Sequence, residues 1–95
     1  MPVHYERKEE ILQKVREIQE EMEAVRAEMA PLQGELSAMY GKFLRQQHRG
    51  YAEDALEKDD ILRKSQRLDV YTERYILLDM QRIALLRELE IQAGD

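Results

Sequence analysis

The chain has 95 residues, of which 37% are charged and 43% hydrophobic, with four Gly, two Pro and no Cys. The lack of Cys excludes disulfides and thiolate metal sites, and the net charge of −5 disfavours general binding to nucleic acid. The sequence contains no run of about 18 apolar residues, the length needed to span a membrane, and its first residues lack the apolar run of a signal peptide. This composition is typical of long helices. We therefore expect one helical domain over residues 1–95, cytoplasmic, with no cofactor and no metal site.

The first half of the chain carries a heptad pattern. Its apolar residues recur at alternating spacings of four and three, which places them in one stripe along one long helix. The pattern predicts a helix over about residues 5–47. The stripe consists of Ile11, Val15, Ile18, Met22, Val25, Met29, Leu32, Leu36, Met39 and Phe43.

Pro31 and Gly34 interrupt this stretch. Proline in a helix interior removes a backbone hydrogen-bond donor and clashes with the preceding turn, so it either kinks the helix or splits it. We favour a kink, because the apolar pattern keeps its phase through Leu32 and Leu36, whereas a loop would usually reset it.

A turn is expected over about residues 48–53. Gly50 suits the left-handed position that often closes a helix. Asp54, followed by Glu57 three residues later, has the spacing of a capping box. The second helix is therefore predicted over about residues 54–92.

The second helix carries more apolar surface than one partner helix can cover. Its main stripe consists of Ile61, Leu68, Tyr71, Tyr75, Leu78, Leu85 and Leu89. Its later half adds Ile76, Leu77, Met80, Ile83 and Leu86. Large exposed apolar patches are rare on monomers. The sequence thus predicts an all-α, antiparallel two-helix hairpin of long, coiled-coil-like helices that forms a homodimeric four-helix bundle, with Ile76, Met80 and Ile83 as dimer contacts.

A polar segment of the second helix is a candidate functional site. Ser65 and Asp69 are four residues apart and share a helical face, while Gln66 lies one helical step aside. Asp69 follows the stripe residue Leu68, so it should stand at the edge of the groove between the helices. It has no cation three or four residues away, which fits either a functional carboxylate or an ordinary solvated one.

The charged residues just before this segment have a simpler explanation. Asp59 can pair with Arg63 and Asp60 with Lys64, each four residues apart. Such surface pairs contribute about 0.2–0.5 kcal/mol each. Together with Arg67, these residues read as an exposed, salt-bridged helix face.

Residues 65–69 read Ser-Gln-Arg-Leu-Asp. This segment is similar to the Ser-Gln-Glu-Leu-Asp motif of the small sporulation regulatory aspartyl-phosphate phosphatases, with Arg67 where the motif has Glu. In that family the motif opens the second helix of a short antiparallel hairpin. A Tyr commonly follows six residues after the Asp, where Tyr75 stands here. Residues 60–62 also match the acidic, branched apolar and Leu residues that commonly precede the motif.

The resemblance implies a regulator that binds the receiver domain of a response regulator and promotes hydrolysis of its aspartyl phosphate. Asp69 would then be the essential residue. Either Gln66 or Asp69 would orient the attacking water, with Ser65 fixing a neighbouring group.

The same resemblance suggests how the partner would be held. Arg63 and Arg67 would meet the acidic rim of the receiver domain, and Tyr75 would add a further contact. The receiver domain supplies its own Mg²⁺, so this chain would need no cofactor.

Two other functions fit the same residues. A non-enzymatic helical adaptor or oligomerisation module would bind another helical protein, or a copy of itself, through the surplus apolar face of the second helix. A regulator that contacts nucleic acid would use the basic turn at Arg45, His48 and Arg49, although the net charge of −5 disfavours it.

Overall fold

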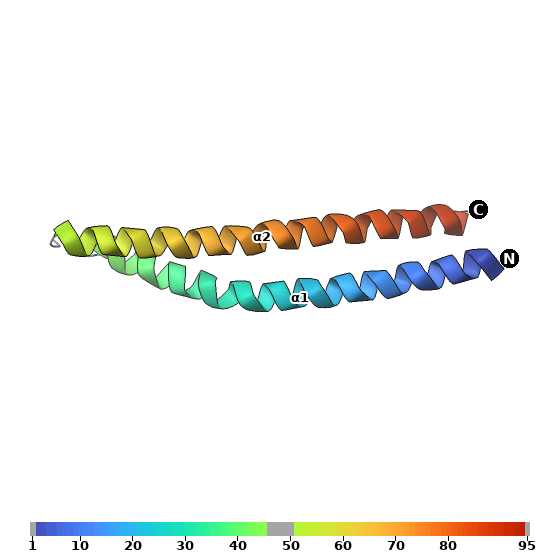
Figure 1. The fold of residues 1–95 in the computed structure, drawn as a ribbon, viewed down its shortest axis with the longest axis horizontal. Helices are drawn as coiled ribbons and strands as arrows, with labels where there is room; N and C mark the ends of the chain where they lie inside the picture. Colours follow the sequence, from blue (N-terminus) through green and yellow to red (C-terminus); the bar gives the residue numbers. More distant parts are fainter. Residues whose placement is uncertain (1, 46–50, 95) are drawn as a thin grey trace. The chain divides into compact units, whose positions relative to one another are not determined.

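The computed structural model consists of two long α-helices (Figure 1). It describes helix α1 (Pro2–Arg45) and helix α2 (Tyr51–Gly94), with side chains placed over residues 6–45 and 55–92. The described residues are helical throughout, and the helices pack against each other in opposite directions. The predicted all-α, antiparallel two-helix hairpin is therefore confirmed. The four-helix bundle stays a prediction.

Both helices begin three residues before the predicted positions. α1 begins at Pro2, since proline's fixed φ and missing N–H suit the first turn of a helix. α2 begins at Tyr51, so Asp54 lies inside its first turn rather than at a cap, and the predicted capping box does not start this helix. No Gly or Pro stands between Tyr51 and Asp54 to delay helix formation. Residues 48–50 of the predicted turn lie outside the described residues.

α1 continues without a break through Pro31. The alternative of a split helix is therefore excluded, in agreement with the uninterrupted apolar phase. The backbone N–H that proline lacks would have bonded to the carbonyl of Ala27, one turn earlier. Pro31 is exposed, so water can reach that part of the helix surface.

Contacts between the helices divide the chain into two compact units. Unit 1 combines Met1–Val25 with Arg74–Asp95, and unit 2 is Arg26–Glu73. Each unit thus pairs a part of α1 with a part of α2 and has a core of its own.

The core of unit 1 is built from the two apolar stripes. Its buried side chains are Ile11, Val15, Met22, Val25 and Leu78, of which Ile11 is fully buried. The half-buried members of the same stripes are Ile18, Tyr75, Leu85 and Leu89. The heptad pattern predicts these positions because a seven-residue repeat keeps them on the side of each helix that faces the other.

Ion pairs link the helices at the edges of unit 1. Arg7 Nη2 lies 2.7 Å from Glu88 Oε1, and Arg74 Nη2 lies 3.8 Å from Glu21 Oε2. The hydrogen bond to Glu88, supported by one to Glu10, raises the pKa of the Arg7 guanidinium. Arg7 therefore remains positively charged and holds α1 and α2 together near the amino-terminal part of α1.

The core of unit 2 follows the same stripes. Its buried side chains are Leu32, Leu36 and Ile61, and its half-buried ones include Met29, Met39, Phe43, Leu68 and Tyr71. Met29 and Met39 of the stripe thus pack between the helices.

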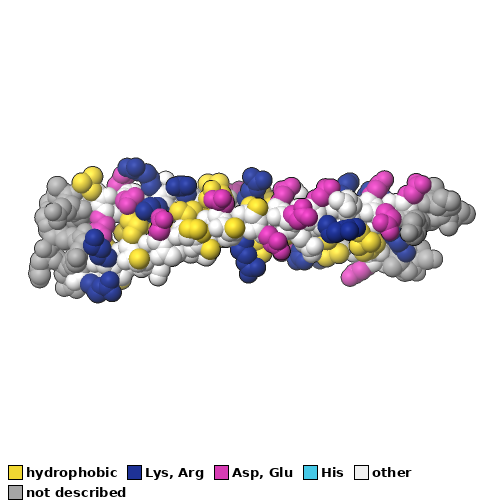
Figure 2. Space-filling view, turned by 90° about the horizontal axis from the view of Figure 1, so that it is seen from below, with side chains coloured by type: hydrophobic (Ala, Val, Ile, Leu, Met, Phe, Trp, Pro, Cys, Tyr) yellow, Lys and Arg dark blue, Asp and Glu magenta, His cyan; other side chains and the backbone are white. Residues whose placement is uncertain are grey.

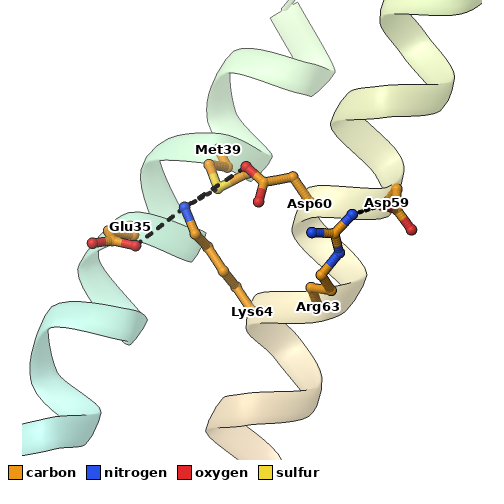
Figure 3. Close-up of polar contacts among 6 residues, drawn as sticks. All are labelled: Glu35, Met39, Asp59, Asp60, Arg63 and Lys64. Atoms are coloured by element: carbon orange, nitrogen blue, oxygen red, sulfur yellow. Dashed lines mark hydrogen bonds and ion pairs between the residues drawn. The ribbon is translucent and has the colours of Figure 1, made fainter.

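Lys64 is a charged residue within the apolar stripe of α2. Its Nζ lies 3.2 Å from Glu35 Oε2 on α1 and 3.7 Å from Asp60 Oδ2 on its own helix (Figure 3). The sulfur of Met39 lies 3.7 Å from the same nitrogen. The pair with Asp60 was expected from the spacing, whereas the pair with Glu35 joins the two helices.

Exposed side chains of both charges occur along both helices. On the face shown in Figure 2, acidic and basic side chains are interspersed rather than gathered by sign. Over the described residues, neither helix contains a stretch that is long and apolar enough to cross a bilayer.

Candidate functional site

An open groove in unit 2 contains two of the predicted site residues. Ser65 and Asp69 both line it from α2, one helical turn apart, because residues four apart share a helical face. Leu68 lines the same groove from α2. The remaining lining residues come from α1 and are Gln33, Leu36, Ser37 and Tyr40.

The polar contacts of this groove centre on Ser65. The Tyr40 hydroxyl lies 3.3 Å from Ser65 Oγ, which links α1 to α2. Two turns beyond Ser65 and outside the groove lining, the Thr72 hydroxyl donates a hydrogen bond of 2.8 Å to the carbonyl of Leu68. Asp69 is exposed, and among the described residues its carboxylate makes no hydrogen bond or ion pair. The groove can therefore present a solvated carboxylate beside the hydroxyl groups of Ser37, Tyr40 and Ser65.

The other predicted site residues lie elsewhere. Gln66 is exposed and does not line the groove. Arg63 is ion-paired with Asp59, as the spacing predicts (Figure 3). Arg67 is exposed, and Tyr75 is a half-buried stripe residue of unit 1. The structure therefore brings Ser65 and Asp69 together in one groove without bringing in Gln66.

Three polar groove residues of α1 were not identified from the sequence. Gln33, Ser37 and Tyr40 follow one another at spacings of four and three. That spacing is the helical repeat itself, so it marks a polar line beside the apolar stripe. It could have been noticed, but the pairing of this line with Ser65 depends on how α1 and α2 are aligned.

A second candidate site is an apolar surface on α2 of unit 1. Ile76, Leu77, Met80 and Ile83 are 53%, 52%, 60% and 39% exposed, although the neighbouring stripe residue Leu78 is only 8% exposed. Ala84 is exposed beside them. We call these five residues, Ile76, Leu77, Met80, Ile83 and Ala84, the outer patch. Because α1 covers the stripe, the outer patch lies on the side of α2 that α1 leaves uncovered.

No metal site accompanies either surface in the part of the chain that the structure describes. No group of three or more His, Cys, Asp or Glu side chains there is arranged to hold an ion. The basic turn considered for nucleic acid includes His48 and Arg49, which lie outside the described residues.

Comparison with protein-family models, curated proteins and solved structures finds no match to this chain.

Proposed function

We propose that this chain is a helical protein–protein interaction module that binds another helix through the outer patch. The observation that carries this proposal is the exposure of four large apolar side chains, at 39–60%, on one side of α2. Burying such a side chain completely is worth about 1.5–3 kcal/mol. Contiguous apolar surfaces of this kind commonly mark interaction sites.

The spacing within the patch favours a helical partner. Ile76, Met80 and Ile83 stand at positions i, i+4 and i+7 of α2. This spacing is the one with which an amphipathic helix presents anchors to a groove or to another helix. The surface is a convex helix face, and the pockets lined by the described residues are open grooves rather than enclosed clefts of the kind most small-molecule enzymes use.

The proposal can be tested by site-specific photocrosslinking in the cells that express the chain. Met80 and Leu62 are each replaced by the photoreactive residue p-benzoylphenylalanine. Leu62 is the matched control, because it is 59% exposed on the same helix but outside the patch. We expect a discrete adduct from position 80 only, and its loss when Ile83→Glu is added. Equal, diffuse labelling from both positions would contradict the proposal.

A second function, a cytoplasmic regulator that promotes dephosphorylation of a sporulation response regulator, is supported by the shared groove of Ser65 and Asp69. In this reaction the oxygen of a water attacks phosphorus, and the bond between phosphorus and the aspartyl oxygen breaks. Inorganic phosphate leaves and the aspartate of the regulator is restored. The Asp69 carboxylate would accept a hydrogen bond from the water and align it, while the regulator's own Mg²⁺ balances the phosphoryl charge. Tyr40 and Ser65 would hold the groove in shape.

The carboxylate of Asp59 provides a matched control for this second function, because it is exposed on the same helix and, among the described residues, pairs with Arg63 alone. The measurement is the rate at which a phosphorylated receiver domain loses its phosphate in the presence of each variant. Asp69→Ala is expected to reduce the acceleration by roughly 100-fold, and Asp59→Ala to leave it within about twofold. The regulatory function would be excluded if the wild-type chain produced no acceleration, or if both variants kept it.

A further inference from the structure

We propose that the outer patch binds a second copy of this chain, with the two α2 helices antiparallel and the two Met80 side chains meeting at the twofold axis. The inference rests on the proposed interaction function and names its partner. Two observations support it: the patch is symmetric about Met80, and its two ends carry opposite charges.

The symmetry can be read along the helix. Leu77 and Ile83 lie three residues to either side of Met80, and Ile76 and Ala84 lie four residues to either side. In a twofold interface the same surface serves both copies. Antiparallel pairing about Met80 therefore places Leu77 against the partner's Ile83, and Ile76 against the partner's Ala84. Every member of the patch meets an apolar side chain.

The charges at the ends of the patch determine the direction. Glu73 and Arg87 each lie seven residues from Met80, on the same line along α2. Both are exposed, and neither makes a hydrogen bond or ion pair within the described residues. In the antiparallel dimer Glu73 faces the partner's Arg87 at both ends. In a parallel dimer Glu73 would face the partner's Glu73, and Arg87 the partner's Arg87, so repulsion disfavours that direction.

The interface ends at these charges. Beyond Glu73, antiparallel pairing would set Asp69 against the partner's Ile91, which is not a favourable match. The contact therefore covers about residues 73–87, or roughly 20 Å of helix at a rise of ~1.5 Å per residue. An interface this short is at the small end of specific complexes, so the dimer should dissociate on dilution.

Sedimentation velocity over a concentration series tests self-association. The wild-type chain is expected to pass from monomer to dimer between roughly 1 μM and 1 mM. Met80→Glu places two like charges at the axis and should weaken dimerisation by at least about tenfold. The control Leu62→Glu introduces the same charge at a similarly exposed site and should leave dimerisation unchanged. A wild-type chain that stays monomeric throughout, or equal effects of the two variants, would overturn the inference.

Exchanging the end charges tests the direction. Glu73→Arg and Arg87→Glu should each weaken the dimer by roughly threefold to tenfold, because each sets like charges against one another at both ends. The double variant should regain most of the wild-type affinity. In a parallel dimer each single change would only replace one like-charge pair by another, so the double variant should show the sum of the two single effects. A double variant that shows this sum, with no regained affinity, would exclude the antiparallel arrangement.

Disulfide formation gives a second measure of direction, because the chain has no Cys of its own. Glu73→Cys and Arg87→Cys are prepared separately and oxidised alone and as a mixture. The antiparallel dimer brings only residue 73 near the partner's residue 87, so cross-linked dimer should form in the mixture and not with either variant alone. Cross-linking of each variant with itself would instead indicate a parallel dimer and refute the proposal. Circular dichroism spectra that match the wild type establish that the variants are folded.

These results separate the inference from the function on which it rests. If the photoadduct at position 80 joins the chain to a different protein while sedimentation shows only monomer, the interaction function holds and self-association is refuted. If position 80 gives no discrete adduct and the chain is monomeric, both are refuted.

Discussion

Ile11 and Ile91 carry the same side chain within unit 1 but have opposite surroundings. Ile11 is fully buried, whereas Ile91 is 69% exposed. Shortening a buried side chain removes its burial free energy and leaves a cavity, while shortening an exposed one does neither. The two residues therefore form a matched pair for measuring what the stripe contributes to stability.

We expect Ile11→Ala to lower the free energy of unfolding by about 2–4 kcal/mol. Ile91→Ala should lower it by less than about 0.5 kcal/mol. Urea denaturation followed by circular dichroism measures both, at a protein concentration at which the chain is monomeric. Similar losses from the two variants would show that the stripe does not form the core of unit 1.

The sequence predicts single residues well where only the local repeat matters. The burial of Ile11 and the pair of Asp60 with Lys64 both follow from spacing within one helix. The contact between Tyr40 and Ser65 was not predicted, because it depends on the rotation and alignment of one helix against the other. Local periodicity does not encode either quantity, so only half of the groove around Asp69 could be anticipated.

The stretch of α1 around Pro31 and Gly34 is helical in spite of two unfavourable residues. Proline in a helix interior costs about 3 kcal/mol and glycine about 1 kcal/mol relative to alanine. The apolar side chains Leu32 and Leu36, both buried, pack against α2 here and offset this cost. Phase continuity predicted the unbroken helix for that reason.

Gly34→Ala is expected to stabilise the chain by about 0.5–1 kcal/mol. A Cβ atom at this position would meet nothing within 4 Å, so the gain in helix propensity carries no steric penalty. Thermal unfolding should shift upward by about 2–8 °C for this size of domain. The reverse change Ala38→Gly, at another exposed position of α1, should shift it downward by a similar amount. A lower melting temperature for Gly34→Ala would mean that glycine is required at this position.

The starts of the helices were predicted less accurately than their existence. The apolar repeats identify both helices, but α2 begins at Tyr51 and not at the apparent capping residue Asp54. Capping preferences are weak compared with the propagation of a long helix, so a helix can extend past a favourable cap when no Gly or Pro intervenes.

The division of the chain into two units is a property that the repeats do not reveal. Both stripes run through both units without a change of phase, yet the contacts cluster separately in unit 1 and unit 2. Each unit has its own buried residues, Ile11 in unit 1 and Leu36 in unit 2 among them. Regions with separate cores can open with different free energies.

We therefore expect core mutations to act mainly on their own unit. Ile11→Ala should accelerate amide hydrogen exchange in residues 6–25 and 74–92 more than in residues 26–73, and Leu36→Ala should do the opposite. Hydrogen exchange read by mass spectrometry on peptides from each unit gives both profiles. Uniform acceleration over the chain by either variant would show that the hairpin opens as one cooperative structure.

Lys64 has a consequence for how the two helices are kept in register. An apolar repeat of seven residues is nearly indifferent to a slip of one heptad, because each layer would find a similar layer opposite. Lys64 lies opposite Glu35 and Arg7 lies opposite Glu88. A slip of one heptad in either direction would therefore lose at least one of these ion pairs. A slip of seven residues in one direction would bring Lys64 level with Lys42. A slip in the other direction would bring Lys64 level with Glu28 but would leave Arg7 level with the uncharged Gln81. The ion pairs of Lys64 and Arg7 together therefore favour one alignment among several that the apolar residues alone would accept.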